Sequence, residues 1–422
     1  MIHIDIPQDV AFILGKLRTA GHEAYAVGGC VRDSLLGKIP KDWDITTSAL
    51  PEDVKEIFPK TIDTGIKHGT VTVMVNSTGY EVTTYRVDGE YLDGRHPEEV
   101  EFTSSLDEDL KRRDFTINAF VYNETEGVKD LFEGLKDLEN GIIRCVGVAE
   151  ERFGEDALRI LRAVRFAAVL SFSIEPETYH AAMKLAGILS KVSAERIKAE
   201  LEKTLVSDNP DYILLLKKLG LSKVILRELD AVNDTEDLKA SLKSVQNEPV
   251  SRWAVLCYYL EKNRKGNEPG GISEKVMLRL KFDNRTMDRV IRFLRIADEY
   301  KDISIEDEKS LNIYCRRLLN AVREEDIFLY IDFARSVGCL PQPAYDAELL
   351  NSTVSAILDR NECFSLKQLK VNGRDILREC GISGKQVGET LDHLLETVMV
   401  APEKNVREVL LEEAKAYGKQ QL

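Results

Sequence analysis

Two aspartates separated by one residue, Asp42 and Asp44, are the first candidates for chemistry in this sequence. On a strand, residues two apart point to the same side, so both carboxylates would face one space, where their repulsion requires a cation. Hard oxygen ligands beside a phosphate favour Mg²⁺. Upstream, Gly28 and Gly29 would let the backbone approach a phosphate closely, and Arg32 would add positive charge. The cluster therefore predicts a site for magnesium and phosphate.

Each of these features also has an ordinary interpretation. A glycine pair is more often a plain turn, and a D-x-D on an edge strand is more often solvated. A third acid, Glu81, on a later predicted strand favours the chemical interpretation. The combination resembles the nucleotidyltransferase superfamily. That resemblance implies in-line attack of a hydroxyl on the α-phosphate of a nucleoside triphosphate, with two Mg²⁺ ions that activate the hydroxyl and stabilise the leaving pyrophosphate.

A longer motif narrows the resemblance. Residues 112–119 read R-R-D-F-T-I-N-A, which is similar to the R-R-D-F-x-x-N-A motif of class II tRNA nucleotidyltransferases, the family of CCA-adding enzymes and bacterial poly(A) polymerases. The alternative for this segment is a charged loop followed by a strand. The resemblance implies that Arg113 contacts the triphosphate. Residues 130–144 and 193–201 resemble two further family motifs, whose implied roles are structural.

Residues 155–159 match the E-D-x-x-R base-reading motif of the same family. We expect Asp156 and Arg159 to be neighbours on one helix, with Arg162 and Arg165 continuing the series. Cytosine and adenine present an amino donor beside a ring-nitrogen acceptor, which a carboxylate and a guanidinium match, whereas uracil and guanine present the reverse order. The pair would select C and A without a template. The alternative is an ordinary helical ion pair worth about 0.3–0.5 kcal/mol.

The elements that must position these residues change character along the chain. Strands are predicted at 23–27, 70–75, 80–86 and 142–146, with a hairpin turn at 76–79. Beyond about residue 150 apolar residues recur at helical spacing. Together with the resemblance, this predicts an α+β head with a nucleotidyltransferase (polymerase beta-like) palm sheet, followed by an all-α neck, body and tail. We place the head at 1–146, the neck with the base-reading helix at 147–206, the body at 207–330 and the tRNA-binding tail at 331–422.

Two segments indicate which family member this is. Residues 85–97 resemble the flexible loop that accompanies A addition, although a plain surface loop is the alternative. Residues 371–375 and 381–388 resemble the tail of the shorter bacterial CCA-adding enzymes, where Gly384 and Lys385 are candidates for tRNA contact. No His-Asp phosphohydrolase signature follows the head, so no phosphatase activity is expected.

Composition limits the remaining function classes. The net charge of the 422 residues is -14, which disfavours a general nucleic-acid binder, but residues 251–296 hold 11 Lys and Arg against 5 Asp and Glu. In this run Arg285, Arg289 and Arg292 are candidates for tRNA backbone contact, or else form a solvated face. Seven scattered cysteines without a C-x-x-C pair predict a reducing cytoplasm rather than a zinc ribbon or a disulfide framework. No run of about 18 apolar residues predicts a membrane span.

Together with the composition, the resemblance implies a cytoplasmic, Mg²⁺-dependent enzyme that adds C, C and A to the 3′ end of tRNA from CTP and ATP and releases pyrophosphate. It would bind the tRNA acceptor arm but neither DNA nor a membrane. One alternative is an A-adding enzyme with a separate CC-adding partner, and another is a poly(A) polymerase. The predicted loop disfavours CC-only addition, and the tail favours tRNA over mRNA. A non-catalytic RNA-binding relative is a rival of another class, although the intact Asp42, Asp44 and Arg113 argue against it.

Overall fold

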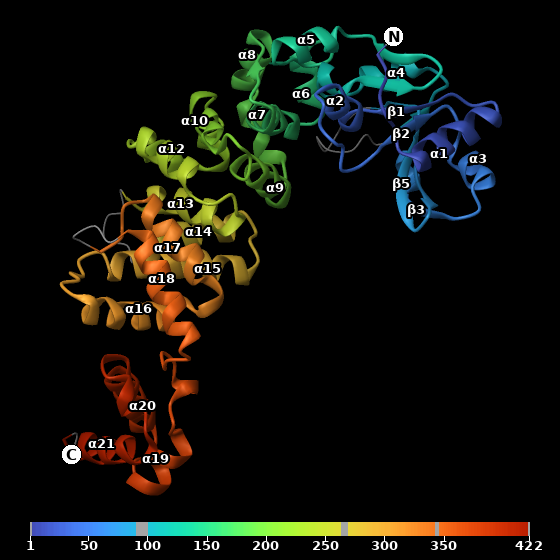
Figure 1. Cartoon of the computed structure of the whole chain (residues 1–422). Coiled ribbons are helices and arrows are strands. Elements are labelled where there is room, and N and C mark those ends of the chain that lie inside the picture. The colour runs from blue at the N-terminus through green and yellow to red at the C-terminus, as the bar shows by residue number, and fades with distance from the viewer. Residues whose placement is uncertain (1, 90–99, 263–268, 342–345, 421–422) are drawn as a thin grey trace. The chain divides into compact units, whose positions relative to one another are not determined.

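The computed structural model describes residues 2–89, 100–262, 269–341 and 346–420. The chain forms two compact units, Met1–Asn233 and Asp234–Leu422 (Figure 1). The predicted head and neck both fall within the first unit. The predicted boundaries at residues 146, 206 and 330 subdivide the two units and stay predictions.

A seven-stranded mixed sheet positions the candidate catalytic residues in the first unit. Its strand order is β3-β4-β5-β2-β1-β8-β9, and the β2–β5 pair is parallel whereas the other neighbours are antiparallel. The strand bounds are β1 Ala24–Val27, β2 Ile45–Thr47, β3 Thr61–Gly65, β4 Thr70–Val75, β5 Thr78–Thr84, β8 Phe120–Asn123 and β9 Gly127–Asp130. The mixed sheet confirms the predicted fold class of the head.

The predicted hairpin is present with a shorter turn than expected. Val75 pairs with Thr78, so only Asn76 and Ser77 form the turn, and their φ angles of 47° and 67° are those of a two-residue hairpin turn. The following strand ends at Thr84 rather than at residue 86. After it, β6 Arg86–Asp88 pairs with β7 Val100–Phe102 in a separate ribbon.

Short helices surround the sheet. Helix α1 contacts β1 and α3, α2 contacts β1 and β8, and α3 contacts β4 and β5. The helices of this part are α1 Gln8–Thr19, α2 Gly29–Leu35, α3 Pro51–Ile57, α4 Leu106–Lys111 and α5 Gly134–Asn140, with the short 3₁₀ segments η1 Ile66–His68 and η2 Thr116–Asn118. Helix α2 directly follows β1, and η2 directly precedes β8, the antiparallel neighbour of β1, so the glycine turn and the R-R-D-F motif reach the same edge of the sheet.

The rest of the first unit is helical, except for one short parallel ribbon. Strand β10 Ile142–Ile143 is shorter than the predicted strand at 142–146, and it pairs with β11 Ser173–Ile174 inside the predicted all-α neck. The helices are α6 Ala149–Glu155, α7 Leu158–Leu170, α8 Pro176–Lys184, α9 Ala194–Leu205, α10 Leu215–Lys218 and α11 Ser222–Ile225, with η3 Ala186–Lys191, η4 Pro210–Leu214 and η5 Arg227–Ala231. Helix α7 packs on α9, and its residues Leu161, Val164 and Ala168 are buried.

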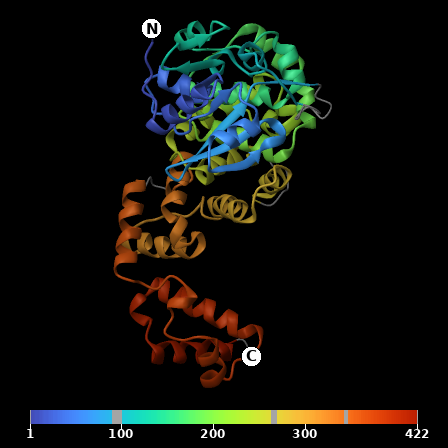
Figure 2. The ribbon, with the colours of Figure 1, turned by 90° about the vertical axis from the view of Figure 1, so that its right-hand side faces the viewer.

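The described part of the second unit consists of helices and loops, as Figure 2 also shows. Its helices are α12 Thr235–Ser244, α13 Pro249–Glu261, α14 Gly271–Arg279, α15 Asn284–Glu299, α16 Glu308–Val322, α17 Ile327–Ser336, α18 Ala347–Asp359, α19 Gly373–Cys380, α20 Lys385–Val400 and α21 Arg407–Gln420, with η6 Glu324–Asp326, η7 Leu366–Gln368 and η8 Pro402–Lys404. Helix α13 is central, since it packs against α12, α14, α15 and α17. Among the residues that the structure describes, none of the helices combines the length and apolar character that a membrane span needs.

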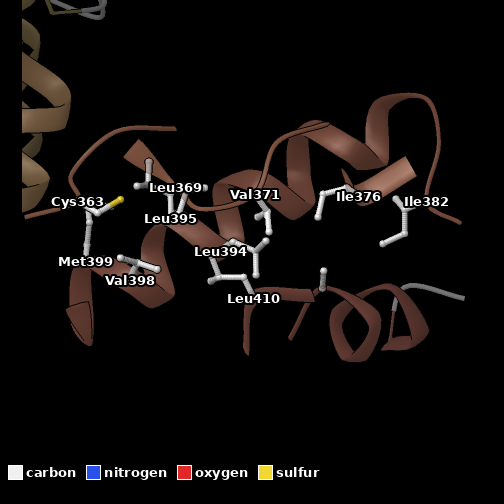
Figure 3. Packing of buried hydrophobic residues seen from close by; sticks show 11 residues of the cluster. Cys363, Leu369, Val371, Ile376, Ile382, Leu394, Leu395, Val398, Met399 and Leu410 are labelled. Atoms are coloured by element: carbon white, nitrogen blue, oxygen red, sulfur yellow. The ribbon is translucent and has the colours of Figure 1, made fainter. Parts of the chain in front are cut away.

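The last three helices enclose a small hydrophobic core of their own. Leu394 of α20 lies between Val371 and Leu410 of α21, and Leu395 lies beside Leu369, while Ile376 of α19 belongs to the same cluster (Figure 3). Leu394, Ile376 and Leu410 are completely buried. This packing positions the glycine-bearing segment 381–385 between α19 and α20.

Candidate active site

The two aspartates lie in an extended segment immediately before β2, because the strand begins only at Ile45. The prediction that they lie on the strand is therefore wrong by a few residues. Trp43 between them is buried, whereas Asp42 and Asp44 are both exposed. The backbone carbonyl of Asp44 accepts a hydrogen bond from the N–H of Val27 (2.9 Å), which fixes this segment to β1. The alternation that places both carboxylates on one side is present.

Glu81 lies beside this pair because of the strand register. In the parallel β2–β5 pair Ile45 is opposite Val82, so the residue before Ile45 is level with Glu81. Loss of water on the protein side raises the pKa of Asp44, the charges of Glu81 and Asp42 raise it further, and Arg113 lowers it. The three acids and Arg113 thus form one interacting cluster.

The donor set of this cluster suits a hard cation. Both exposed aspartates offer carboxylate oxygens, the ligands that Mg²⁺ prefers, and nucleotide phosphates commonly complete its coordination. Across the described ranges, no group of three or more His, Cys, Asp or Glu side chains is arranged to hold a metal ion. One or two carboxylates are the usual protein share of an Mg²⁺ site, where water and phosphate oxygens supply the remaining ligands.

Gly28 and Arg113 form a cradle next to the cluster. Gly28 has a φ of +79°, and a Cβ there would lie 3.2 Å from Nη1 of Arg113 and 3.6 Å from the carbonyl oxygen of Asn118. Only glycine fits this backbone and this close approach. The Nε of Arg113 is buried and has no hydrogen-bond partner. A buried guanidinium nitrogen without a partner beside a bare glycine backbone fits an anionic ligand such as a phosphate.

Arg32 and Gly29 are held in the same region by α2. Gly29 is the first residue of that helix. Arg32 is buried, its Nη1 donates to Oδ1 of Asn118 (2.6 Å), and its Nε and Nη2 donate to Oδ1 of Asp33. Arg32 therefore ties the glycine turn to Asn118 of the R-R-D-F motif.

Asp156 does not lie on the helix that carries Arg159, which corrects the prediction. It has an extended backbone (φ −132°, ψ 105°) between α6 and α7. Its Oδ1 accepts from the N–H of Leu158 (3.0 Å), and its Oδ2 accepts from Nη2 of Arg196 (2.8 Å). The physical reason is that a short carboxylate competes for backbone N–H groups and is more stable at a helix start than within a helix.

Arg159 lies in the first turn of α7 and contacts groups other than Asp156. Its Nη1 donates to Oε2 of Glu155 (2.5 Å) and to the carbonyl of Arg152 (3.0 Å), and its Nη2 donates to the carbonyl of Arg112 (2.8 Å). The side chains of Asp156 and Arg159 thus each have partners of their own, and the backbone N–H of Arg159 donates to the carbonyl of Asp156 (3.0 Å). Arg159 therefore binds the residue that directly precedes Arg113 in the chain.

The next two arginines of α7 also bind carboxylates. Arg162 donates from Nε (2.7 Å) to Oδ2 of Asp114, and Arg165 donates from Nε to Oε2 of Glu200 (2.6 Å). Burial alone would raise the pKa of Asp114, but Arg162, together with other hydrogen bonds and charges, lowers it to about 2. The guanidinium carbons of Arg32, Arg162 and Arg165 lie 5.2, 5.3 and 3.9 Å from the ring centroid of Phe166.

Sequence reasoning missed the residues that hold the candidates in place. Asp109, Asn118, Arg196 and Glu200 all contact predicted site residues. Asp109 had a local signal, because it lies three and four positions before the arginine pair, the spacing of neighbours on a helix. Asn118 lies inside the motif at 112–119, and Arg196 and Glu200 lie inside the motif at 193–201, but their spacing did not indicate which site residue each of them contacts.

The predicted tRNA contacts differ in exposure. Arg285 is exposed, whereas Arg289 pairs with the buried Asp326 (2.5 Å), and Arg292 pairs with Asp288 and donates to the carbonyl of Val322. Gly384 (φ +63°) and Lys385 are both exposed at the start of α20. Of the predicted flexible loop, residues 90–97 lie outside the described residues.

Comparison with known proteins agrees with this geometry. Residues 24–144 match the poly A polymerase head domain, and residues 171–233 match a domain described as a probable RNA and SrmB-binding site of polymerase A. The CCA-adding enzyme of Ligilactobacillus salivarius is 39% identical over 96% of this chain and 95% of its own length. The crystal structure of the Bacillus stearothermophilus CCA-adding enzyme in complex with CTP has a TM-score of 0.80 and 32% identity, covering 98% of each chain. A Thermotoga maritima CCA-adding enzyme complexed with tRNA shares the fold, with a TM-score of 0.65 at 22% identity over 98% of this chain and 96% of that one. The chain therefore belongs to the CCA-adding enzymes, a family of nucleotidyltransferases.

Proposed function

We propose that this enzyme adds C, C and A to the 3′ end of tRNA from CTP and ATP without a template and releases pyrophosphate. The observation that carries the proposal is the joining of two sets of residues by one segment. Within residues 112–114, the charge of Arg113 lowers the pKa of Asp44. In the same segment, the carbonyl of Arg112 accepts a hydrogen bond from Arg159, and the carboxylate of Asp114 accepts one from Arg162. A nucleotide held along this segment has its triphosphate near the acidic cluster and its base near α7.

Family membership suggests a requirement for a divalent metal, and we assign Mg²⁺ to Asp42 and Asp44. When bound, the metal lowers the pKa of the attacking 3′ hydroxyl and neutralises charge on the phosphates. The exposed carboxylates of Asp42 and Asp44 hold it, and Glu81 adds negative charge at the level of Asp44. Glu81 therefore strengthens the local attraction for a cation without being required as a ligand.

The triphosphate is assigned to the cradle formed by Gly28, Gly29, Arg32 and Arg113. Arg113 offers the buried Nε that has no partner within the protein. A guanidinium donates in a fixed, planar geometry that suits phosphate oxygens. Arg32 positions the turn through Asn118, so its contribution to binding is through the backbone of the turn as well as its charge.

The base is assigned to Asp156 and Arg159, with Arg162 and Arg165 assisting. Asp156 accepts a hydrogen bond from the amino group of cytosine or adenine, and Arg159 donates a hydrogen bond to the adjacent ring nitrogen. The hydrogen bonds to Leu158 and Arg196 orient the Asp156 carboxylate. Uracil and guanine would set donor against donor and acceptor against acceptor, which costs about 1–3 kcal/mol for each buried group left unpaired.

For the acceptor arm of tRNA, we assign Arg285, Gly384 and Lys385 as backbone contacts, because all three are exposed. Arg289 and Arg292 are assigned a supporting role through their acid partners. All seven cysteines are free thiols, which agrees with a cytoplasmic location, where thiols stay reduced.

The experiment uses purified protein, Mg²⁺ and a tRNA transcript that lacks all three terminal nucleotides. We expect CTP alone to extend it by two nucleotides, and CTP with ATP to extend it by three. Extension only of a transcript that already ends in CC, by ATP, would assign the protein as an A-adding enzyme. A ladder of added A on unrelated RNA would assign it as a poly(A) polymerase, the activity that the matched head-domain model also describes.

Two variants separate catalysis from binding. Asp42→Asn should abolish extension while tRNA binding in a filter assay is kept. Asp107→Asn removes the same charge at an exposed position of α4 and serves as the matched control, which should extend tRNA normally. Normal extension by Asp42→Asn would contradict the metal assignment.

A further inference from the structure

A completely buried carboxylate, Asp109, lies behind the proposed nucleotide site. It belongs to α4 and has no exposed surface. Burial alone would raise the pKa of Asp109, but the neighbouring charges of Arg112 and Arg113 lower it below the ordinary value. The group is therefore ionised at neutral pH. Burial of a charged carboxylate costs free energy unless cations and hydrogen-bond donors compensate it, so its partners show its role.

Asp109 holds both arginines of the R-R-D-F motif. Its Oδ1 accepts from Nε (3.0 Å) and Nη2 (2.6 Å) of Arg112, in a two-pronged contact. Its Oδ2 lies 3.5 Å from Nη2 of Arg113. This contact leaves the Nη1 of Arg113 against Gly28 and the buried Nε without a partner, so the guanidinium is turned towards the glycine turn.

The same carboxylate is fixed to the strand that follows the catalytic aspartates. Oγ1 of Thr46, two residues after Asp44, donates to Oδ2 of Asp109 (3.0 Å). The backbone N–H of Arg86 approaches Oδ1 (3.4 Å) from the start of β6. On the other side, the carbonyl of Arg112 accepts from Arg159. One side chain thus connects β2 with the groups assigned to the triphosphate and to the base.

We propose that Asp109 is a positioning residue for nucleotide binding, which fixes the Arg113 guanidinium towards the triphosphate and holds the Arg112 backbone where Arg159 binds it. The proposal rests on the triphosphate role assigned above to Arg113. Asp109 itself touches neither substrate nor metal. It acts by setting the distance between Asp42 and Asp44, which lie just before β2, and the guanidiniums that bind the nucleotide.

Removal of the charge distinguishes positioning from electrostatics by the sign of the effect. Asp109→Asn keeps the size of the side chain but turns an amide N–H₂ or a neutral oxygen towards two guanidiniums. If Asp109 acted only through its charge, its removal would leave the pocket more positive, and the KM for CTP and ATP would fall. If it positions Arg113, both values should rise at least tenfold while the KM for tRNA changes less than twofold. A fall or no change in the nucleotide KM would overturn the proposal, as would an equal rise for tRNA.

Three further variants make every outcome decisive. Asp107→Asn removes the same charge from the exposed face of the same helix and should leave all KM values unchanged. Arg113→Gln tests the role on which the proposal rests: an unchanged nucleotide KM in this variant refutes that role, whereas a rise there without a rise in Asp109→Asn refutes positioning alone. Thr46→Val keeps the Asp109 charge and removes one hydrogen bond, so it should raise the nucleotide KM two- to fivefold. If Asp109→Asn does not fold, the Thr46→Val result decides, and an unchanged KM there overturns the proposal.

Discussion

The buried ion pair between Asp114 and Arg162 should contribute measurably to the stability of the first unit. Oδ1 of Asp114 accepts from the N–H of Phe115 (2.9 Å) and from Nδ2 of Asn118 (3.1 Å), while Oδ2 binds Arg162. The pKa of this carboxyl falls from 3.8 to about 2. At 1.36 kcal/mol for each factor of ten, this corresponds to about 2 kcal/mol in the free energy of unfolding at neutral pH. We therefore expect Asp114→Asn to lose roughly that amount.

The loss should depend on pH in a defined direction. Because the pKa of Asp114 is lower in the folded than in the unfolded protein, its stabilisation is complete above about pH 5 and disappears as the pH falls. The difference between wild type and Asp114→Asn should fall to about 1 kcal/mol at pH 3 and to a small fraction of the neutral-pH value at pH 2. For a unit of this size, about 2 kcal/mol at pH 7 corresponds to a decrease of about 4–8 °C in Tm.

Scanning calorimetry and urea unfolding of the full chain measure both quantities. The exposed Asp107→Asn is the matched control and should change stability by less than about 0.5 kcal/mol. The reasoning would be refuted if Asp114→Asn unfolded at the wild-type temperature at pH 7. A difference that stayed the same from pH 7 to pH 3 would also refute it, because the loss would then come from shape rather than charge.

Three further outcomes are expected. Gly28→Ala should raise the KM for both nucleotides, because its Cβ meets Arg113 at 3.2 Å, whereas Gly21→Ala, with a φ of +92° but open space, should cost only backbone strain of about 1–2 kcal/mol in unfolding experiments. Arg285→Glu should raise the dissociation constant for tRNA in filter binding and leave the nucleotide KM unchanged, and an unchanged tRNA affinity would remove Arg285 from the interface. Leu394→Ala should cost about 2–5 kcal/mol in the calorimetric transition of the second unit and leave the first-unit transition in place, since Leu394 is completely buried in the tail core.

Features set by neighbouring residues could be predicted from the sequence. The alternation of Thr70–Val75 and the turn residues after it predict the hairpin, because strand faces repeat every two residues. Trp43 between two aspartates predicts that the acids share a side, since one apolar residue directs its neighbours outward. The parallel register that brings Glu81 to Asp44 was not predictable, because it depends on which strands become neighbours.

The helical assignment of Asp156 failed for a local reason. Apolar spacing on both sides favours one continuous helix, but the carboxylate binds the N–H of Leu158 and begins a new helix there. The sequence pattern does not separate a helix-starting aspartate from one within a helix when the flanking residues are good helix formers. The structural outcome moves Asp156 off the helical surface and frees its second oxygen for Arg196.

Three ion pairs around α7 could not be read from spacing. Asp114 and Arg162 are 48 positions apart, Glu200 and Arg165 are 35 apart, and Asp156 and Arg196 are 40 apart. Charge patterns along a chain indicate only partners three or four residues away. Partners that are far apart in the sequence depend on the tertiary fold, which therefore also determines which arginines bind a carboxylate.

In the proposed pocket, the partners of Asp156 and Arg159 would allow two side chains to select bases without a template. A base pair in a nucleic acid derives its selectivity from donors and acceptors held in one plane by a rigid ring. Asp and Arg are flexible, and a rotation that exchanged the position of donor and acceptor would remove the preference for cytosine and adenine over uracil and guanine. In the proposed pocket, Leu158 and Arg196 hold Asp156, while Glu155 and the carbonyls of Arg152 and Arg112 hold Arg159. Because these hydrogen bonds are made before any base arrives, the entropy of orienting both side chains is lost on folding rather than on binding. If Asp156 and Arg159 face the base as proposed, the selectivity depends on the anchoring residues as much as on these two.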